Sequence, residues 1–447
     1  MAKRLLILGA GISGIGTAIL AASRAWKVCL SDQGFLSASQ KEELQPYAID
    51  IEEGGHVKIW KEEYDLVVKS PGMSNNLPIV QHFIDKGVNV IGEIEFAFQY
   101  MGQSKVIGIT GTNGKSTTAS LLFHTLKKSG LNCALAGNIG YSFAKQIALN
   151  PKDWYVLELS SFQLDDIQKF YPEIAVILNI SEDHLDRYES MDNYVHSKFK
   201  IAQNQTEKHL LILNLDDPYI AKYIENNTLK PKIAGMSREV NQLNEPIVAM
   251  KKEDNLHFKW NEEETEISIH DLALKGSHNQ YNTMAAGISA RALGLRNELI
   301  RESFSTFGGL EHRLKQVRIV NDVEFINDSK ATNLNSVWFA LESMTKPTVL
   351  ILGGQDKGND YEEIRDVVEE KVTHIVCLGK DNSKIIQAFS SNYSIIETQT
   401  AVDAVQAAYA VAEPGSVVLL APGCASFDLF KSFEDRGEQF KEAVMKL

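Results

Sequence analysis

The feature that most constrains this chain is a glycine-rich turn between an apolar run and a helical pattern. The run Val106 to Ile109 is typical of a buried strand, and Ala119 to Leu126 has the apolar spacing of a helix. Between them, residues 109–118 read I-T-G-T-N-G-K-S-T-T. Such a turn directs backbone N–H groups, an ammonium and a hydroxyl at a phosphate and its Mg²⁺. The turn therefore predicts an ATP-using enzyme.

The turn departs from the usual G-x-x-x-x-G-K-[ST] pattern at one position. Ile109 stands where the first glycine is expected, and the additional glycine is Gly111. A glycine turn that binds nothing is the alternative, but a lysine followed by three hydroxyl residues at a helix start favours phosphate binding. The predicted phosphate-binding residues are Gly111, Thr112, Asn113, Gly114, Lys115, Ser116 and Thr117.

Length and charge narrow the function classes. A chain of 447 residues is too long for one core and suggests three domains. The formal charge of -13 argues against nonspecific binding to nucleic acid or anionic membranes. Four widely spaced cysteines suit a reducing cytosol. Glycines interrupt the apolar N-terminus, so we expect a cytoplasmic protein without an export signal, and a monomer by default.

Strand and helix patterns divide the chain into three α/β domains. We predict an N-terminal Rossmann-like domain over residues 1–95, a central P-loop ATPase-like domain over 96–309 and a C-terminal Rossmann-like domain over 310–447. Three short segments within residues 245–272 alternate in hydropathy as antiparallel strands do. Elsewhere, alternation of strands and helices predicts parallel sheets with ligands at the strand ends.

A second glycine motif opens the chain. Residues 9–14 read G-A-G-I-S-G between a predicted strand and a helix, and Asp32 ends the next predicted strand. Taken alone, this pattern predicts a nicotinamide dinucleotide site. The same geometry suits any diphosphate, including that of a UDP-sugar. A glycine turn with a purely structural role is a further alternative. No hydride-transfer site is evident downstream.

Several polar residues follow predicted strands in the central domain. Glu158 is either a Mg²⁺ ligand or a solvated residue at a strand end. His184 is either a metal ligand or a residue that merely lies at the start of a helix. Asn279 suits a base edge or a helix cap. Lys198 lies on a predicted helix, where a lysine is ordinarily solvated.

Polar loops also follow successive predicted strands in the C-terminal domain. The residue ranges are 327–333, 352–358 and 421–428, the last of which leads to 433–437. The polar residues of each loop alone could simply form a turn. Because the loops follow the carboxyl ends of successive strands in one sheet, together they favour a ligand-binding crevice.

These motifs together resemble the Mur ligase family, the ATP-dependent amide-forming enzymes of peptidoglycan precursor synthesis. The resemblance extends over the whole chain and includes T-G-T-N-G-K-S-T, D-H-L-D-R at 183–187, S-H-N at 277–279 and E-H-R at 311–313. N-D-S-K-A-T-N at 327–333, with C-A-S at 424–426 and F-E-D-R-G at 433–437, is similar to the D-glutamate-adding branch.

The resemblance implies substrates, cofactors and residue roles. It implies ATP and two Mg²⁺ ions, with UDP-N-acetylmuramoyl-L-alanine and D-glutamate as the other substrates. Catalysis would use Lys115, Glu158, His184 and Lys198; the metal ligands would be Ser116, Glu158, His184 and a carbamylated Lys198. Asn279, Arg313 and Asp328 would join the phosphate-binding turn around ATP. The nucleotide substrate would contact Gly11, Ile12, Ser13, Gly72, Asn138, Ser160 and Gln163, and D-glutamate would contact Lys330, Thr332, Lys357, Ser426 and Phe433.

The resemblance also implies a mechanism and leaves rivals. An acyl-phosphate would form from ATP and the alanine carboxylate, and closure of the C-terminal domain would protect it from water. Close relatives often carry Thr-Arg where this chain has Gln33 and Gly34, so we assign no uridine contact there. The rivals are another amino acid-adding ligase or a folate or cyanophycin relative, a nicotinamide-dependent oxidoreductase, and a P-loop ATPase or regulatory module.

Overall fold

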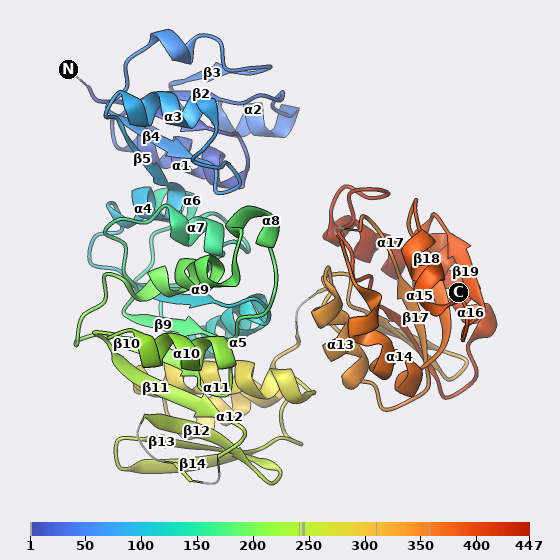
Figure 1. The fold of residues 1–447 in the computed structure, drawn as a ribbon. Helices are drawn as coiled ribbons and strands as arrows, with labels where there is room; N and C mark the ends of the chain where they lie inside the picture. Colours follow the sequence, from blue (N-terminus) through green and yellow to red (C-terminus); the bar gives the residue numbers. More distant parts are fainter. Residues whose placement is uncertain (1, 241, 244–245, 310, 357) are drawn as a thin grey trace. The chain divides into compact units, whose positions relative to one another are not determined.

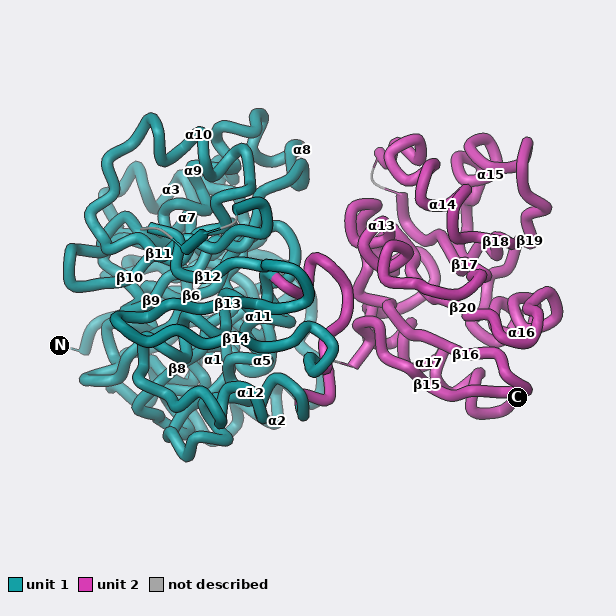
Figure 2. Tube along the Cα trace, turned by 90° about the horizontal axis from the view of Figure 1, so that it is seen from below, with its two compact units in different colours: residues 1–272, 281–306 teal, residues 273–280, 307–447 magenta. Residues whose placement is uncertain are grey.

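The computed structural model describes residues 2–240, 242–243, 246–309, 311–356 and 358–447, without the side chain of Asp186. Contacts divide the chain into two compact units, which Figure 2 shows in different colours. Residues 1–272 and 281–306 form the first unit, and residues 273–280 and 307–447 form the second.

The first sheet of the first unit is parallel throughout and has the order β3-β2-β1-β4-β5. Its strands are β1 (Arg4–Leu8), β2 (Lys27–Ser31), β3 (Ile49–Glu52), β4 (Leu66–Lys69) and β5 (Asn89–Gly92). The helices around it are α1 (Ile12–Ser23), α2 (Ala38–Leu44), the 3₁₀ helix η1 (Ile59–Lys61), α3 (Pro78–Asp85) and α4 (Glu93–Phe98). Helices pack on both faces of a parallel sheet, which explains why β1 and β4 read as continuous apolar runs.

The second sheet of this unit has nine strands in the order β14-β13-β12-β11-β10-β9-β6-β8-β7. Its strands are β6 (Lys105–Thr110), β7 (Cys133–Gly137), β8 (Trp154–Glu158), β9 (Ile174–Ile177), β10 (Leu210–Asn214), β11 (Lys232–Ser237), β12 (Ile247–Lys252), β13 (Asn255–Trp260) and β14 (Glu263–Ser268). The predicted antiparallel segments are β12 to β14, and β12 also pairs in parallel with β11.

The helices that accompany this sheet include the one that follows the phosphate-binding turn, α5. They are α5 (Lys115–Lys128), α6 (Phe143–Leu149), α7 (Ser161–Asp165), α8 (Leu185–Tyr188), α9 (Met191–Phe199), η2 (Lys200–Ala202), α10 (Pro218–Asn226), α11 (Ser277–Ala292) and α12 (Asn297–Thr306). Strand β6 lies between β8 and β9, so the loops after these three strands meet at one edge of the sheet. Open parallel sheets bind ligands at such an edge.

The two sheets of the first unit share one core. A single cluster of buried apolar side chains runs from β1 and α1 through α4 and α6 into the central sheet. Helix α1 approaches α6 so closely that a Cβ on Gly16 would lie 1.9 Å from the hydroxyl of Ser142. Figure 1 shows α4 and α6 between the two sheets. The first sheet is thus held against the second by packing as well as by the chain.

The second unit is a six-stranded sheet with the order β15-β16-β20-β17-β18-β19, in which only the β15–β16 pair is antiparallel. Its strands are β15 (Lys315–Val320), β16 (Val323–Asn327), β17 (Thr348–Leu352), β18 (Val372–Leu378), β19 (Ile395–Thr398) and β20 (Val417–Leu420). Its helices are α13 (Leu334–Glu342), η3 (Tyr361–Ile364), α14 (Arg365–Lys371), α15 (Ser383–Phe389), α16 (Ala401–Val411) and α17 (Phe433–Met445). Separate apolar clusters cover its two faces, as a doubly wound sheet requires.

Candidate active site

The turn after β6 has the backbone that phosphate binding needs. Gly114 precedes α5 with φ +82°, and a Cβ there would lie 2.2 Å from Asn282 Oδ1, so only glycine fits. Lys115 begins the helix, and its ammonium donates to the carbonyl of Gly111 at 2.9 Å and of Thr112 at 2.7 Å. The lysine is therefore folded over the turn, next to the N-terminal N–H groups of α5.

The loop after β9 holds this turn in place. Asn113 N donates to Asn179 Oδ1 at 2.8 Å, and Asn179 Nδ2 donates back to the Asn113 carbonyl at 3.0 Å. Thr112 Oγ1 accepts from Ser181 N at 3.0 Å, and Thr112 N donates to the Asn179 carbonyl at 2.9 Å. The turn is thus rigid before any ligand binds, which reduces the entropy lost on binding.

Three hydroxyls around the turn are buried without a hydrogen-bond partner among the described residues. They belong to Thr110, Thr117 and Ser181. A buried polar group without a partner is costly, and such groups are found where a polar ligand completes the site. The arrangement therefore fits triphosphate oxygens and their metal-bound waters.

A second lysine meets the turn from α9. Lys198 is buried, and its Nζ donates to the same Gly111 carbonyl at 2.8 Å and lies 4.4 Å from the ring centroid of Tyr194. Burial, and next the charge of Lys115, lower the pKa of Lys198 well below its usual value. A neutral amine is the form that reacts with carbon dioxide, so the surroundings fit the carbamylation implied by the resemblance.

Glu158 lies where the sequence predicts it, at the carboxyl end of β8. Its side chain is buried, and Asn138 Nδ2 donates to its Oε1 at 3.0 Å. Gly137 lies beside it with φ +100°, where a Cβ would come within 2.3 Å of the Glu158 carbonyl. The structure thus brings together Asn138 and Glu158, two residues expected to serve different ligands.

His184 lies in the loop after β9, immediately before α8. Its φ is +55°, a left-handed conformation that few non-glycine residues adopt. Its ring lies 4.9 Å from the ring of Phe162, centroid to centroid. The guanidinium of Arg187 lies over the same Phe162 ring, 4.1 Å from its centroid. Strained backbone is often found at functional sites, which is consistent with the predicted role.

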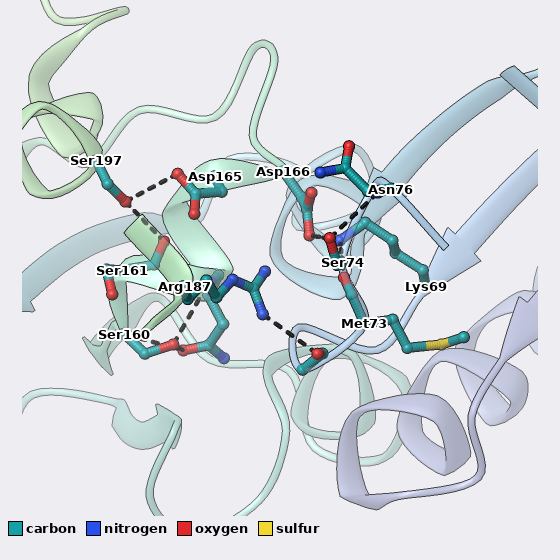
Figure 3. Close-up of polar contacts among 12 residues, drawn as sticks. Lys69, Met73, Ser74, Asn76, Ser160, Ser161, Asp165, Asp166, Arg187 and Ser197 are labelled. Atoms are coloured by element: carbon teal, nitrogen blue, oxygen red, sulfur yellow. Dashed lines mark hydrogen bonds and ion pairs between the residues drawn. The ribbon is translucent and has the colours of Figure 1, made fainter. Parts of the chain in front are cut away.

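Arg187 connects this loop to the first sheet. Its Nη1 donates to the carbonyl of Gly72, a predicted substrate residue, at 3.2 Å (Figure 3). Ser160 and Gln163, also predicted for substrate, form a capping box that begins α7: each accepts a hydrogen bond from the other's backbone N–H, at 3.2 and 3.0 Å. The structure therefore gives these two side chains a local structural role, and substrate binding stays a prediction for them.

The first glycine motif forms a tight turn between β1 and α1. A Cβ on Gly14 would lie 1.8 Å from the Gly9 carbonyl, so close packing requires glycine there. Gly11 and Ile12 are exposed and Ser13 is half-buried, as ligand-binding residues would be. Both carboxylate oxygens of Asp32 accept backbone N–H groups, from Ala10 at 2.5 Å and Gly34 at 2.7 Å. Asp32 thus shapes the turn, whereas a dinucleotide site would direct this acid at a ribose.

The second unit gathers its predicted residues around the loop after β16. Lys330 Nζ lies 5.3 Å over the ring of Phe433, and the half-buried Arg313 is the main charge that lowers the pKa of Asp328. Burial outweighs it and raises the pKa of Asp328 to about 6. Ser426 is buried, Thr332 is exposed, and Lys357 lies outside the described residues.

Asn279 belongs to the second unit by its contacts, although it lies on α11. Its side chain is buried, and its Nδ2 donates to the Lys275 carbonyl at 2.7 Å. The bond closes the turn before the helix, and both alternatives for Asn279, a base-edge contact and a helix cap, stay predictions.

Some residues of the site were not singled out from the sequence. Arg436 is fully buried and joins the loops after β16 and β20 through Ser329 and Cys424. It belongs to F-E-D-R-G, but the sequence alone does not distinguish a buried arginine in a helix from a solvated one. The central site is completed from distant segments by Asn179, Asn282 and Tyr194. The sequence indicates only that these residues follow a strand or lie on a helix.

The described part of the chain lacks two features. No helix there is long and apolar enough to cross a membrane. No three histidine, cysteine, aspartate or glutamate side chains among the described residues are grouped as a metal site. The predicted metal ligands include only two residues of these types, Glu158 and His184; the others are a serine and a modified lysine.

Comparisons with known proteins agree with this geometry. Residues 3–92 match the family profile "Mur ligase MurD-like, N-terminal domain", residues 109–290 match "Mur ligase middle domain", and residues 312–424 match "Mur ligase, glutamate ligase domain". Proteins named "UDP-N-acetylmuramoylalanine--D-glutamate ligase" from Christiangramia forsetii and Bacteroides fragilis are each 46% identical over the full length of both chains. The protein of that name from Porphyromonas gingivalis is 42% identical over 99% of this chain and 98% of its own.

Solved structures share the fold at low identity. A pseudomurein peptide ligase type C from Methanothermus fervidus matches with a TM-score of 0.62 and 21% identity over 99% of both chains. A UDP-N-acetylmuramate-alanine ligase from Thermotoga maritima matches with a TM-score of 0.64 and 16% identity, also over 99% of both chains. Full-length relatives, three matching domain profiles and a phosphate-binding turn braced by the loop after β9 lead to one conclusion: this chain belongs to the Mur ligase family.

Proposed function

We propose that this chain joins the amine of D-glutamate to the alanine carboxylate of UDP-N-acetylmuramoyl-L-alanine, with conversion of ATP to ADP and phosphate. The names of its full-length relatives support the reaction. The observation that carries the proposal is the meeting of Lys115 and the buried Lys198 at the carbonyl of Gly111. A turn that only binds phosphate does not need a second, desolvated lysine.

The proposal divides the residues among three ligands. Gly111 to Thr117 would bind the ATP phosphates, with Asn279, Arg313 and Asp328 on the rest of the nucleotide. The UDP-sugar-peptide would contact Gly11, Ile12, Ser13, Gly72, Asn138, Ser160 and Gln163. D-glutamate would contact Lys330, Thr332, Lys357, Ser426 and Phe433, because cations and hydroxyls suit its two carboxylates.

Mg²⁺ fits the central site through oxygen ligands. Ser116 and Glu158 are both buried beside the turn, and the hydroxyls of Thr110 and Thr117 are buried without a hydrogen-bond partner in the described part of the chain. Ser116 and Glu158 would hold one ion, and His184 with a carbamylated Lys198 would hold the second. Bound Mg²⁺ would offset the negative charge shared by the triphosphate and the attacking carboxylate.

The chemistry proceeds in two displacements. A carboxylate oxygen of the alanine attacks the γ-phosphorus, the bond to the β-phosphate oxygen breaks, and ADP leaves with an acyl-phosphate formed. The unprotonated amine of D-glutamate then attacks the acyl carbon, and the tetrahedral adduct loses phosphate to give the amide. Lys115 lies at the N-terminus of α5 and would stabilise charge on the transferred phosphoryl group.

We further propose where the domains divide, the cellular compartment and the oligomeric state. Domain boundaries at residues 95 and 309 separate the part that would bind the UDP-substrate, the part that would bind ATP and the part that would bind the amino acid. We propose a cytoplasmic monomer, because the reaction uses ATP and a nucleotide precursor and its proposed residues come from one chain.

Phosphate release from ATP and Mg²⁺ tests the function. The reaction contains UDP-N-acetylmuramoyl-L-alanine with D-glutamate, L-glutamate, L-alanine or no amino acid. Release should require both the nucleotide precursor and D-glutamate. Release that is indifferent to the amino acid would favour a simple ATPase, and release with another amino acid would favour another branch of the family.

One variant in the same assay addresses Lys198. Lys198→Arg keeps a positive charge but cannot form a lysine carbamate. We expect it to lose phosphate release by about a hundredfold or more, as loss of a group acting at the transferred phosphoryl does. Activity within a few-fold of the unmodified chain would exclude a carbamate at this position.

A further inference from the structure

A buried ion pair connects β4 of the first sheet to the end of α7. Lys69 ends β4 and is only 1% exposed, and its Nζ lies 2.5 Å from Asp166 Oδ2 (Figure 3). The Asp166 side chain is 4% exposed, and the residue is the C-cap of α7. Lys69 therefore comes from the N-terminal sheet and its partner from the central domain, 97 residues away.

Asp166 is held against the first sheet by its backbone as well. Gly92, the last residue of β5, donates its N–H to the Asp166 carbonyl at 3.3 Å and lies directly opposite Lys69 in the β4–β5 pair. A Cβ on Gly92 would lie 3.0 Å from Asp166 Cβ, so a side chain there would displace Asp166. The end of α7 thus docks across the carboxyl ends of two parallel strands.

Lys69 also holds the loop that follows it. The same Nζ donates to the Met73 carbonyl at 2.9 Å, and Met73 N donates to the Ser70 carbonyl at 3.0 Å. The lysine therefore closes the Ser70–Met73 turn from inside. Arg187 Nη1 reaches the same turn from the central domain through the Gly72 carbonyl.

The two ends of this connection carry proposed substrate residues. Gly72 is on the turn that Lys69 closes, whereas Ser160 and Gln163 begin the helix that Asp166 ends. One rigid path thus runs from the Gly72 turn through Lys69 and Asp166 along α7 to its capping box. The path sets the distance between two groups that must contact one ligand.

A structural role alone does not explain an ion pair in this position. Removing two charges from water costs about as much as their attraction returns, so buried ion pairs seldom stabilise more than apolar side chains of the same volume. Burial raises the pKa of Asp166 although Lys69 lowers it, and Asp165 and Arg187 are the other charges that act on it. The pair does orient the loop after β4, because the Lys69 ammonium donates to the Met73 carbonyl and an apolar side chain could not.

We propose that Lys69 and Asp166 are positioning residues for the nucleotide substrate, fixing the Ser70–Met73 turn relative to the start of α7. The inference rests on the proposed function, because it takes UDP-N-acetylmuramoyl-L-alanine as the ligand of both segments. It adds a pair that neither touches the reacting atoms nor belongs to the motifs of the sequence.

Three variants separate positioning from folding. Lys69→Met removes the ammonium, Asp166→Asn keeps the shape of its partner, and Lys69→Met/Asp166→Leu leaves no buried charge. We measure KM for each substrate, kcat, the melting temperature, and the Kd of UDP-N-acetylmuramoyl-L-alanine by calorimetry without ATP.

We expect a raised KM and Kd for the nucleotide substrate only. A small displacement of a positioning group should raise both by about tenfold or more in Lys69→Met and in the double variant, and leave the KM for ATP within about twofold. The double variant should melt close to the unmodified chain, because its buried charges are gone.

The control is a second polar contact between the same two segments. Asn89 and Gln168 exchange hydrogen bonds of 3.2 and 2.8 Å between β5 and the residues after α7, but both are exposed and neither contacts the turn. Asn89→Ala/Gln168→Ala should keep the normal KM and Kd.

Several outcomes overturn the inference. A double variant with normal KM and Kd would show that the pair only packs, and so would an equal rise of KM in the Asn89 and Gln168 control. If none of the three variants folds, the pair is a requirement of folding and the positioning role is wrong. Failure of the unmodified chain to bind the nucleotide substrate would instead contradict the proposed function.

Discussion

At the scale of single residues, Asp328 is the carboxylate whose surroundings most change its chemistry. It follows β16, is buried, and its Oδ1 has no hydrogen-bond partner among the described residues. Burial raises its pKa to about 6, against the effect of Arg313 and the backbone N–H of Leu314. Near neutral pH the group is thus ionised although it is buried, and Arg313, Lys330 and any cation bound beside it would stabilise its charge.

This pKa predicts how stability depends on pH. Between about pH 4 and 6 the folded chain keeps the Asp328 proton while the unfolded chain has released it, so stability falls as the pH rises through this window. The free-energy change is on the order of 2–3 kcal/mol and is complete above about pH 6. Asp328→Asn should therefore gain stability relative to the unmodified chain as the pH rises from 4 to 7.

Two measurements check this prediction. Carboxyl-carbon NMR, with the Asp328 signal assigned by its loss in Asp328→Asn, should give a titration near pH 6. Melting of the two proteins side by side at pH 4 and 7 should show the stability difference growing with pH. A titration at the ordinary value near pH 4, or a difference that does not change with pH, would contradict the prediction.

At the scale of elements, the buried Arg436 of α17 connects this helix to the loops that we propose bind the amino acid. Arg436 donates from Nε to Ser329 Oγ at 3.0 Å, from Nη2 to the Ser329 carbonyl at 2.8 Å, and from both Nη atoms to the Cys424 carbonyl at 3.2 Å. Burial lowers its pKa to about 10, so it is still charged at neutral pH. The helix thereby fixes the loops after β16 and β20 relative to each other.

Arg436→Met should loosen these loops. It leaves the two carbonyls buried without partners, which costs about 3 kcal/mol, and it should raise the KM for D-glutamate. Hydrogen exchange should be faster in peptides covering residues 328–333 and 423–427. Arg318→Met is the matched control, because its exposed guanidinium donates at 3.2 Å to the Met445 carbonyl at the other end of α17. Unchanged exchange in Arg436→Met, or equal changes in both variants, would refute this role.

Elements with a strong local pattern were predicted well from the sequence. The β6 strand, its glycine turn and α5 follow from the continuous pattern of residues 106–126, and the turn conformation follows from the need for glycine at position 114. The antiparallel strands β12 to β14 follow from alternation. Strands β3, β15 and β19 carry no clear signal in the sequence, because most of their residues are half-buried or exposed.

At the scale of the whole molecule, the sequence predicts which loops share a sheet edge but not which side chains meet. The Asn179 brace, the Lys198 contact with Gly111 and the Lys69–Asp166 pair each join segments at least 66 residues apart. No local pattern encodes such pairs, because they depend on how the sheets pack. Residues 273–280, predicted with the central domain, group with the second unit by their contacts.

The central claim is that ligation proceeds through an acyl-phosphate. Following the two oxygen atoms of the alanine carboxylate into the products tests this claim most directly. UDP-N-acetylmuramoyl-L-alanine carrying ¹⁸O in both oxygens of its alanine carboxylate is converted with ATP, Mg²⁺ and D-glutamate, and product and phosphate are analysed by mass spectrometry. Attack of the carboxylate on phosphorus predicts one ¹⁸O in the amide product and one in the released phosphate. Phosphate without ¹⁸O, or phosphate released without formation of the amide, would contradict the account.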